Sequence, residues 1–431
     1  MFVRSASILT LGCKVNTYES EYVLNLLLEH GYEMKSFDDK CDVYIINTCT
    51  VTNTSDLKSR KMIRRARRNN PDACVVAMGC YVEANDNSKG VEADIVVGTK
   101  HKGKVIEYID QWFRTRSQIV DVTKELAETF EDMEIHRFLG RTRAFVKIQD
   151  GCENYCAYCI IPYVRGKCRS KDPERVVHEI TELVQKGYRE IVLTGIHTGN
   201  YGVDLGMKFA DILKRIVTIP GLYRLRISSI EITELDDQVL ELIRNYPVIV
   251  DHLHIPLQSG SEAVLKAMNR KYDKKYFLDK VKRIRSIRPN ISLSTDVIVG
   301  FPGETEEDFE ESYNFMKEIH FSKIHVFPYS KREGTKAALM ELQISEEEKK
   351  RRVKRVLELS HELEIDYMKQ FLGKELDVLV EVNREDYSLG HTSNYLLVKI
   401  PGNYSSETIL NVQITSVTYP YCNAGVLTKQ L

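Results

Sequence analysis

Three cysteines fall close together in the middle of the chain, and their spacing constrains the local fold more than any other feature of the sequence. Cys152, Cys156 and Cys159 follow the pattern Cys-x-x-x-Cys-x-x-Cys. Three such thiols cannot all pair as disulfides, but each thiolate can ligate one iron of a cubane cluster. A four-iron cluster held by three cysteines keeps one iron open for a small chelating molecule. A structural cluster or zinc site would be closed by a fourth side chain, for which Cys168 is the candidate.

An aromatic residue, Tyr158, directly precedes the third cysteine of this run. With that aromatic, the run resembles the signature of radical S-adenosylmethionine (SAM) enzymes. The resemblance implies that SAM chelates the open iron of a 4Fe-4S cluster and is cleaved there to a 5'-deoxyadenosyl radical. The alternative interpretations are a zinc knuckle and a redox-active cysteine pair.

Length and composition exclude several classes of protein. The chain has 431 residues, too many for one compact core, with 43% hydrophobic and 29% charged residues, as in ordinary globular proteins. No signal peptide opens it, and no apolar run approaches the roughly 18 residues of a membrane span. Ten cysteines without a secretory signal favour a reducing compartment. We therefore expect a cytoplasmic monomer with no membrane partner.

Short apolar runs separated by helical patterns occupy the first part of the chain. They predict a parallel sheet with both faces covered, and they span residues 6–11, 42–46, 74–78 and 93–97. Cys13, Cys49 and Cys80 each follow the carboxyl end of one run. Since such ends meet at one edge of an open α/β sheet, the three cysteines should converge and can hold a second cluster with an open iron. The alternative is three small buried hydrophobic residues. Three other cysteines are expected to be structural: Cys41, Cys74 and Cys422.

Three short motifs around these cysteines resemble the radical SAM methylthiotransferase family: Leu11-Gly12-Cys13-Lys14-Val15-Asn16, Asn47-Thr48-Cys49 and Met78-Gly79-Cys80. The resemblance covers essentially the whole chain and implies one 4Fe-4S cluster on each cysteine triad. The Gly-Cys-Lys-Val-Asn form resembles the branch that acts on threonylcarbamoyladenosine in tRNA. The isopentenyl-adenosine branch typically reads Gly-Cys-Gln-Met-Asn, and the branch that modifies a ribosomal-protein aspartate reads Gly-Cys-Pro-Lys-Asn.

After an acidic stretch that includes Glu125 and is typical of a solvated linker, six further strand candidates alternate with helices. They predict the partial (β/α)6 barrel of radical SAM enzymes, with chemistry at the carboxyl ends of the strands. These candidates are residues 145–149, 190–194, 224–228, 252–257, 292–299 and 323–327. The predicted organisation of this α/β chain is an N-terminal open parallel α/β domain (1–118), a linker (119–137), the radical SAM core (138–370) and a small all-β barrel (371–431).

Polar residues at the later strand ends of the barrel are candidates for binding SAM. In the family, residues at the positions of Thr194, Gly195 and His197 receive the SAM amino group. A cation on the third strand can hold the methionine carboxylate, and an acid or hydroxyl the ribose. The Gly-rich run at 299–305 lacks the Gly-Lys-Ser/Thr ending of a phosphate loop, and we expect it to pass close to the adenine. The remaining candidates are Tyr158, Arg226, Ser228, Glu231, His254, Gln258 and Asp296.

Residues 57–70 predict a helix with one strongly basic face. At about 100° per residue its basic side chains cover an arc of about 140°, opposite Met62, Ile63 and Ala66. Because the formal net charge of the chain is −1, a local patch of this kind is needed to attract RNA; the alternative is a solvated helix face. The basic face consists of Arg60, Lys61, Arg64, Arg65 and Arg68. Further basic residues flank the three-cysteine loop, and we expect them to continue the basic surface as a track for RNA: Arg141, Arg143, Arg165, Lys167, Arg169 and Lys171.

From Phe371 onward the pattern is all-β, with strands predicted at 375–382, 395–400 and 409–419. A small OB-like barrel fits, a class that often binds RNA, and the segment resembles the TRAM domain of the family. It has four Lys/Arg against six Asp/Glu, which argues against an electrostatic RNA grip. It therefore binds RNA through shape and single contacts, or it mainly docks onto the central barrel.

The resemblance implies methylthiolation of C2 of N6-threonylcarbamoyladenosine at position 37 of tRNA, with SAM as both radical source and methyl donor. The implied partners are the tRNA anticodon loop and an electron donor such as flavodoxin or ferredoxin. Two rivals use the same chemistry on isopentenyl-adenosine or on a ribosomal-protein side chain. A third is an iron–sulfur RNA-binding protein without catalysis.

Overall fold

An all-parallel sheet forms the N-terminal part of the computed structural model, which describes residues 3–84, 90–122, 128–138, 140 and 142–429. The spatial order is β2-β1-β3-β4-β5-β6. β3 and β4 are buried along their whole length, as expected for central strands covered on both faces. The strands are β1 (Ser5–Thr10), β2 (Glu33–Met34), β3 (Val43–Thr48), β4 (Cys74–Gly79), β5 (Ile95–Val97) and β6 (Ile119–Asp121), and the helices are α1 (Lys14–Glu29), α2 (Asn53–Asn69), α3 (Cys80–Ala84) and α4 (Val105–Thr115).

The segment predicted as a solvated linker is largely packed. β6 pairs in parallel with β5, so the sheet extends beyond residue 118. Met133 and Ile135 are buried against the central part of the protein, so the prediction of a solvated segment is wrong at these two positions. The charged residues around them, such as Asp132 and Glu134, concealed the two apolar anchors. Glu125 lies outside the described residues.

Six parallel strands follow one another around the central part, confirming the predicted partial barrel. They form two three-stranded sheets, joined by bridges from Leu225 to Ile249 and from Ser229 to His254. The strands are β7 (Arg143–Lys147), β10 (Glu190–Thr194), β11 (Arg224–Ile227), β12 (His252–His254), β13 (Ser292–Val299) and β14 (Lys323–Pro328). β12 ends three residues earlier than expected, because Ile255–Leu257 bond irregularly to the β13 strand.

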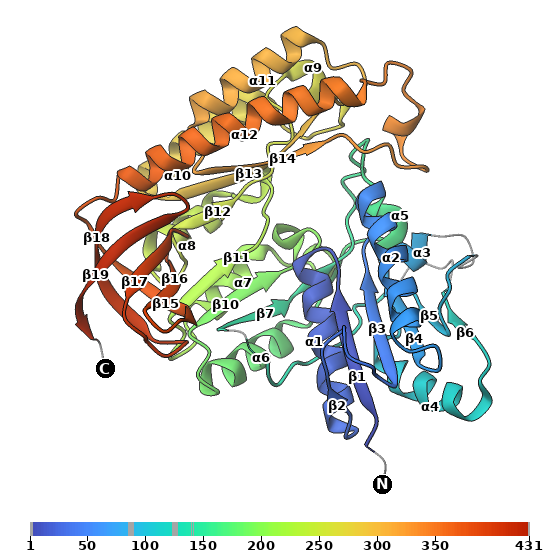
Figure 1. Ribbon diagram of the computed structural model, residues 1–431. Helices are drawn as coiled ribbons and strands as arrows, with labels where there is room; N and C mark the ends of the chain where they lie inside the picture. The colour runs from blue at the N-terminus through green and yellow to red at the C-terminus, as the bar shows by residue number, and fades with distance from the viewer. Residues whose placement is uncertain (1–2, 85–89, 123–127, 139, 141, 430–431) are drawn as a thin grey trace.

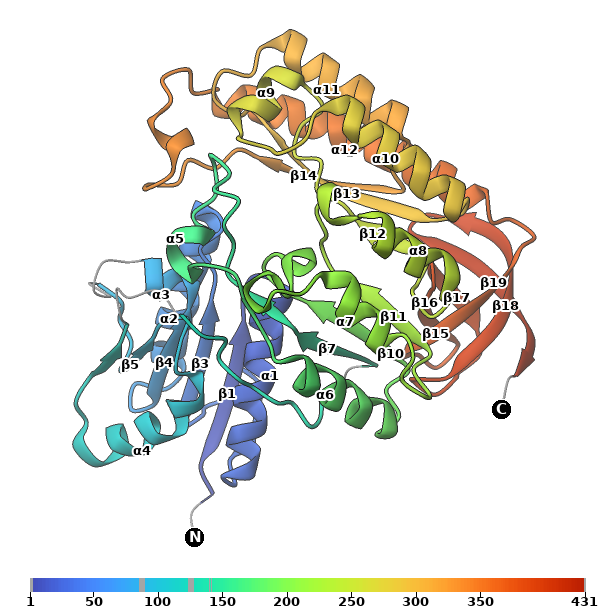
Figure 2. The ribbon, with the colours of Figure 1, turned by 180° about the vertical axis from the view of Figure 1, so that it is seen from behind.

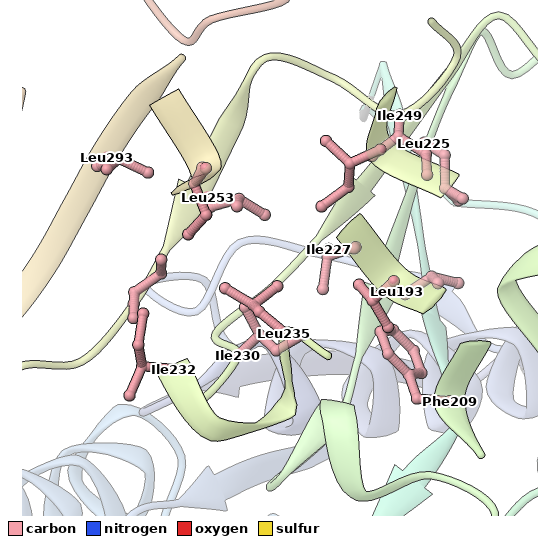
Figure 3. Close-up of a cluster of buried hydrophobic side chains, with 14 of the residues drawn as sticks. Leu193, Phe209, Leu225, Ile227, Ile230, Ile232, Leu235, Ile249, Leu253 and Leu293 are labelled. Atoms are coloured by element: carbon pink, nitrogen blue, oxygen red, sulfur yellow. The ribbon is translucent and has the colours of Figure 1, made fainter. Parts of the chain in front are cut away.

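Helices cover the outer face of these strands (Figures 1 and 2). They are α6 (Pro173–Gln185), α7 (Phe209–Ile216), α8 (Asp237–Asn245), α9 (Glu262–Ala267), α10 (Lys274–Ile287), α11 (Glu306–Ile319) and α12 (Glu346–Lys369). Within the described ranges, every helix is too short or too polar to span a bilayer. Figure 3 shows a cluster of side chains such as Leu193, Ile227 and Leu253 that fills the space between neighbouring strands. This apolar packing fixes the strands, so polar groups at their carboxyl ends are held in place.

A closed five-stranded barrel completes the chain, as predicted, and lies across the central part from the N-terminal sheet (Figures 1 and 2). The spatial order is β15-β16-β17-β19-β18. The sequence pattern missed β16 and β19. β16 carries Gly390, whose added Cβ would lie 2.1 Å from the Leu379 carbonyl oxygen, so the glycine that weakens the pattern is required there. The strands are β15 (Glu375–Asn383), β16 (Tyr387–Thr392), β17 (Leu397–Pro401), β18 (Ile409–Thr418) and β19 (Tyr421–Lys429).

Candidate metal centres and the adjoining cavity

The loop set (Cys152, Cys156 and Cys159) lies after the short strand β8 (Gln149–Asp150), on a loop held by its backbone. The Cys152 amide donates to the Gly166 carbonyl at 3.0 Å, and the Ala157 amide donates to the Met268 carbonyl at 2.9 Å. These bonds leave all three thiols partly exposed. The three cysteine residues are therefore neither fully buried nor fully exposed.

Two basic side chains stand beside the loop set. His197 Nδ1 lies 3.8 Å from Cys152 Sγ, and an Arg270 guanidinium nitrogen donates to Cys156 Sγ at 3.3 Å. Burial alone would lower the pKa of His197, but its hydrogen bonds to Cys152 and Glu234 outweigh burial and raise the pKa to about 10. These donors point at sulfur atoms, which is the environment that an anionic thiolate-bound group requires.

The surroundings of the loop set suit cysteines that ligate a cluster better than they suit free thiolates. Burial, reinforced by Cys156 and Cys152, raises the pKa of the Cys159 thiol to about 12. A bound cation would reverse that preference. In the described part of the chain, no three His, Cys, Asp or Glu side chains converge tightly enough to hold a single metal ion. In a cubane each cysteine ligates a different iron, so this spacing favours a multinuclear group over the zinc alternative.

The strand-end set (Cys13, Cys49 and Cys80) follows β1, β3 and β4, and the structure brings the three together as the topology predicted. Burial raises the pKa of the Cys49 and Cys80 thiols, and each of the three thiols also senses the charge of another member of the set. Cys49 and Cys80 are buried, whereas Cys13 is exposed. An exposed thiol over two buried ones leaves an open side to the site.

A glycine makes the strand-end set possible. Gly12 has φ +97°, and a Cβ added there would lie 2.8 Å from Cys49 Cβ and 2.9 Å from Cys49 Sγ. Any larger residue would push Cys49 away from Cys13. The Gly-Cys pair is therefore a requirement of the packing as well as a sequence motif.

Arg165 joins the two cysteine sets. It ends α5 (Ile161–Arg165), directly after the loop set, and is 1% exposed. Its Nε donates to Cys80 Sγ at 3.3 Å, and its Nη1 donates to Glu19 at 2.9 Å and to Asp150 at 3.0 Å. One buried guanidinium thus ties a strand-end thiol to the segment that carries the loop set.

The predicted basic track around the loop is wrong for three of its members. Arg165, Arg169 and Lys171 are buried and engaged within the protein. Arg143 pairs with Glu190 and Glu381, while Lys167 is exposed and Arg141 lies outside the described residues. The segment from residue 165 to 171 is buried except at Lys167, so these charges lie inside, where Arg165 and Lys171 pair with acids of other elements.

Eight of the ten candidate SAM residues fall into two groups. His197, Glu231 and Tyr158 lie near the loop set: Glu231 pairs with Arg270, and Arg270 and Cys156 both influence the titration of Tyr158. Sequence reasoning missed Arg270, because it lies among other cations such as Lys271 and Lys274 and resembles a surface charge. Thr194 ends β10, whereas Gln258 lies beyond the end of β12 and bridges to Val297 of β13. Cys168 is buried, and its thiol donates to the Asn200 carbonyl at 3.3 Å.

The second group of candidate SAM residues lines a cavity: Gly195, Arg226, Ser228, His254 and Asp296.

This cavity, about 570 Å³ in volume, lies beside Cys13 and between the three parts of the protein. Lys14 opens onto it from α1, and Tyr395 closes it from the C-terminal barrel. Lys14 is exposed to solvent at this wall. Partial desolvation by the surrounding protein, together with the charges of Arg226 and Arg143, lowers its pKa to about 8. A cavity of this size and depth suits a small organic group.

The C-terminal barrel docks onto the central part through its acids. Arg224 bonds to Asp377 at 2.7 Å, and Arg143 pairs with Glu381. The Tyr395 ring stacks on His252 with 4.8 Å between centroids. The excess of acids in this barrel is therefore used in docking, in line with the second of the two expected roles.

The basic helix α2 buries Ile63 and Ala66 as predicted, whereas Met62 is only half-buried and Ser59 is buried in addition. Its charged face is more mixed than the sequence indicated, since Arg64 pairs with Glu92 and Arg65 pairs with Asp38. The structure records no ion pair for three exposed members of the described helix: Arg60, Lys61 and Arg68.

Two family models match the chain. The model of the Radical SAM superfamily matches residues 146–316, which include the loop set, and the model of the Uncharacterized protein family UPF0004 matches residues 5–98, which include the strand-end set. The boundary between the two matches falls between the two cysteine sets.

Curated relatives match over nearly the whole length. The "Threonylcarbamoyladenosine tRNA methylthiotransferase MtaB" of Bacillus subtilis (strain 168) is 47% identical over 96% of this chain and 94% of the relative. The "tRNA-2-methylthio-N(6)-dimethylallyladenosine synthase" of Clostridium botulinum (strain Loch Maree / Type A3) is 37% identical over 94% of this chain and 93% of the relative. A solved structure of the radical SAM methyltransferase TsrM from Kitasatospora setae is similar in fold, with a TM-score of 0.56 at 13% identity over 75% of this chain and 72% of that chain.

Proposed function

Since this chain belongs to the radical SAM tRNA methylthiotransferase family, we propose that it methylthiolates C2 of N6-threonylcarbamoyladenosine at position 37 of tRNA. The chain is an enzyme, and its family uses SAM and two 4Fe-4S clusters. The observation that carries the proposal is that one fold holds two separate three-cysteine sets joined through Arg165. A single-cluster enzyme would have no use for the second set.

Cys152, Cys156 and Cys159 would hold the cluster that binds SAM, and Cys13, Cys49 and Cys80 would hold the other. When bound, the first cluster with SAM supplies the radical that removes hydrogen from C2, and the second cluster supplies the sulfur that replaces it.

The chain's own side chains position these groups. Arg270 donates to the Cys156 sulfur, and His197 stands beside the Cys152 sulfur. Arg165 donates to the Cys80 sulfur from a fully buried position. Such bonds to ligating sulfurs orient the ligands and stabilise negative charge. Arg226, the cation expected to hold SAM, lies instead in the cavity beside Cys13. Arg270 is therefore a better candidate than Arg226 for contacting SAM.

RNA would be attracted by α2. This helix follows Cys49 and exposes Arg60, Lys61 and Arg68, so its cationic face belongs to the same domain as the strand-end set. Phosphate contacts of this kind give affinity without reading sequence. They favour tRNA over the rival substrate, a ribosomal-protein side chain.

The test is anaerobic reconstitution of the full chain with iron and sulfide, followed by incubation with SAM, a reductant and tRNA carrying threonylcarbamoyladenosine. We expect 5'-deoxyadenosine and a nucleoside heavier by one methylthio group in place of hydrogen. Absence of 5'-deoxyadenosine would establish the non-catalytic rival. Modification of isopentenyl-adenosine or of ribosomal peptides alone would reassign the substrate.

A further inference from the structure

The cavity beside Cys13 offers hydrogen-bond donors that lack acceptors. The acids of its wall are already paired: Asp296 bonds to His254 at 3.2 Å, and Glu364 bonds to Lys323 at 3.1 Å. Within the described chain, the groups of this wall that lack hydrogen-bond partners are instead nitrogen atoms.

Arg226 carries the clearest unmatched donor. It is 2% exposed, and its Nε donates to Glu190 at 2.8 Å. Its Nη1 is buried and has no hydrogen-bond partner among the described residues. An unpartnered guanidinium N–H away from water is costly. Arg226 lines the cavity, so an acceptor there gains this donor by a small shift of the guanidinium.

Two further groups face the same space. His252 bonds to the Ser294 hydroxyl through Nε2 at 2.9 Å, while its Nδ1 has no partner in the described structure. Lys14 lines the cavity next to Cys13 and forms no salt bridge within the described ranges. Arg226 is also held in place, because its guanidinium stacks 4.6 Å from the Tyr395 ring centroid. The wall is thus a pre-positioned site for an anion.

We infer that Lys14 and Arg226 bind the carboxylate on the N6 substituent of the substrate adenosine. This inference rests on the proposed function, because it places the base at the strand-end set. A threonylcarbamoyl substituent ends in an amino-acid carboxylate, whereas an isopentenyl substituent is a hydrocarbon. A site built to pair with a carboxylate rejects an uncharged analogue, since the buried donor of Arg226 is then unsatisfied and exposed Lys14 loses its ionic partner. Lys14 is therefore a specificity-determining residue for the enzyme.

The location supports the substrate over SAM as the source of the carboxylate. The cavity wall contains Cys13 of the strand-end set, and it contains none of the loop cysteines. The loop set has its own guanidinium in Arg270. The carboxylate of SAM bound at the loop set would therefore meet Arg270, leaving Lys14 and Arg226 for the substituent of the base.

The test compares two anticodon stem-loops, one with threonylcarbamoyladenosine and one with its neutral methyl ester. Dissociation constants are measured by fluorescence anisotropy with the reconstituted full-length enzyme and with Lys14→Gln. The wild type should bind the acid about tenfold more tightly than the ester, the scale of one charged hydrogen bond. Lys14→Gln should lose most of that difference by weakening the acid only. Lys40→Gln is the matched control, because Lys40 is exposed at the amino end of β3, on the opposite edge of the sheet.

Three results would overturn the inference. Equal wild-type affinity for acid and ester would show no carboxylate recognition. Equal weakening of both stem-loops by Lys14→Gln would indicate general attraction to RNA. A loss of SAM affinity in Lys14→Gln, measured by equilibrium dialysis, would assign the site to SAM. Wild-type product formation is checked in parallel: no methylthio product would remove the proposed function and this inference together, whereas product with equal affinities removes the inference alone.

Discussion

The two cysteine sets reach similar chemistry by opposite routes. The loop set comes from one short segment, and backbone bonds to Gly166 and Met268 hold it. The strand-end set comes from three strands, and it exists only when the whole parallel sheet has formed. A local set can be damaged without damage to the fold, whereas a set assembled at strand ends is sensitive to the packing around it. Because the two sets are built from different segments, each set can be removed by mutation without the other, and their roles can be tested separately.

The largest effect is expected from Cys156→Ala. Removing one of three ligands from the loop set should abolish both 5'-deoxyadenosine formation and methylthio product, because SAM is cleaved at that set. The fold should persist, since the loop is held by backbone bonds. Both products are measured by liquid chromatography, and circular dichroism checks that the variant is folded. Normal product would overturn the assignment.

Cys49→Ala should separate the two sets. The methylthio product should disappear, while some uncoupled 5'-deoxyadenosine should still form because the loop set is intact. The same assay applies, with Cys41→Ala as the control: Cys41 is buried at the amino end of the same strand. Complete loss of SAM cleavage in Cys49→Ala would mean that the sets do not act separately.

Gly12→Ala tests the sensitivity of the strand-end set to packing. The added Cβ would lie 2.8 Å from Cys49 Cβ, so we expect iron content to fall by about half as the strand-end set alone fails. Gly31→Ala is the control, because Gly31 has φ +78° and nothing within 4 Å. It carries only the backbone strain of about 1 kcal/mol. Equal iron loss in the two variants would show that strain, and not contact with Cys49, is responsible.

The smallest effect concerns RNA. Replacing Arg60 and Lys61 together by Gln should weaken tRNA binding several-fold and lower the slope of log affinity against log salt by about 1 to 2. Arg64 and Arg65, on the same helix, are already paired with Glu92 and Asp38. Their double Gln variant should therefore have a smaller effect on binding. The reverse ranking would place the RNA on another surface.

The sequence predicted the local set more completely than the assembled one. The spacing of Cys152, Cys156 and Cys159 sufficed for the loop, and strand order sufficed to bring Cys13, Cys49 and Cys80 together. The predicted strands of the central barrel agree with the structure to within a few residues, because their apolar runs are buried. Arg165 and Arg270 show what the pattern did not contain. Each contacts a sulfur that is distant in sequence, and a charge that is buried by tertiary pairing looks like a surface charge along the chain.

Counting iron in three proteins tests the separate use of the two sets most directly. The wild type is reconstituted anaerobically beside a triple Cys→Ala variant of each set, and iron and sulfide are measured with electron paramagnetic resonance of the reduced samples. We predict about eight irons per wild-type chain and about four in each triple variant, since each set would hold one 4Fe-4S cluster. About four irons in the wild type, or loss of all iron from either triple variant, would contradict two independent centres.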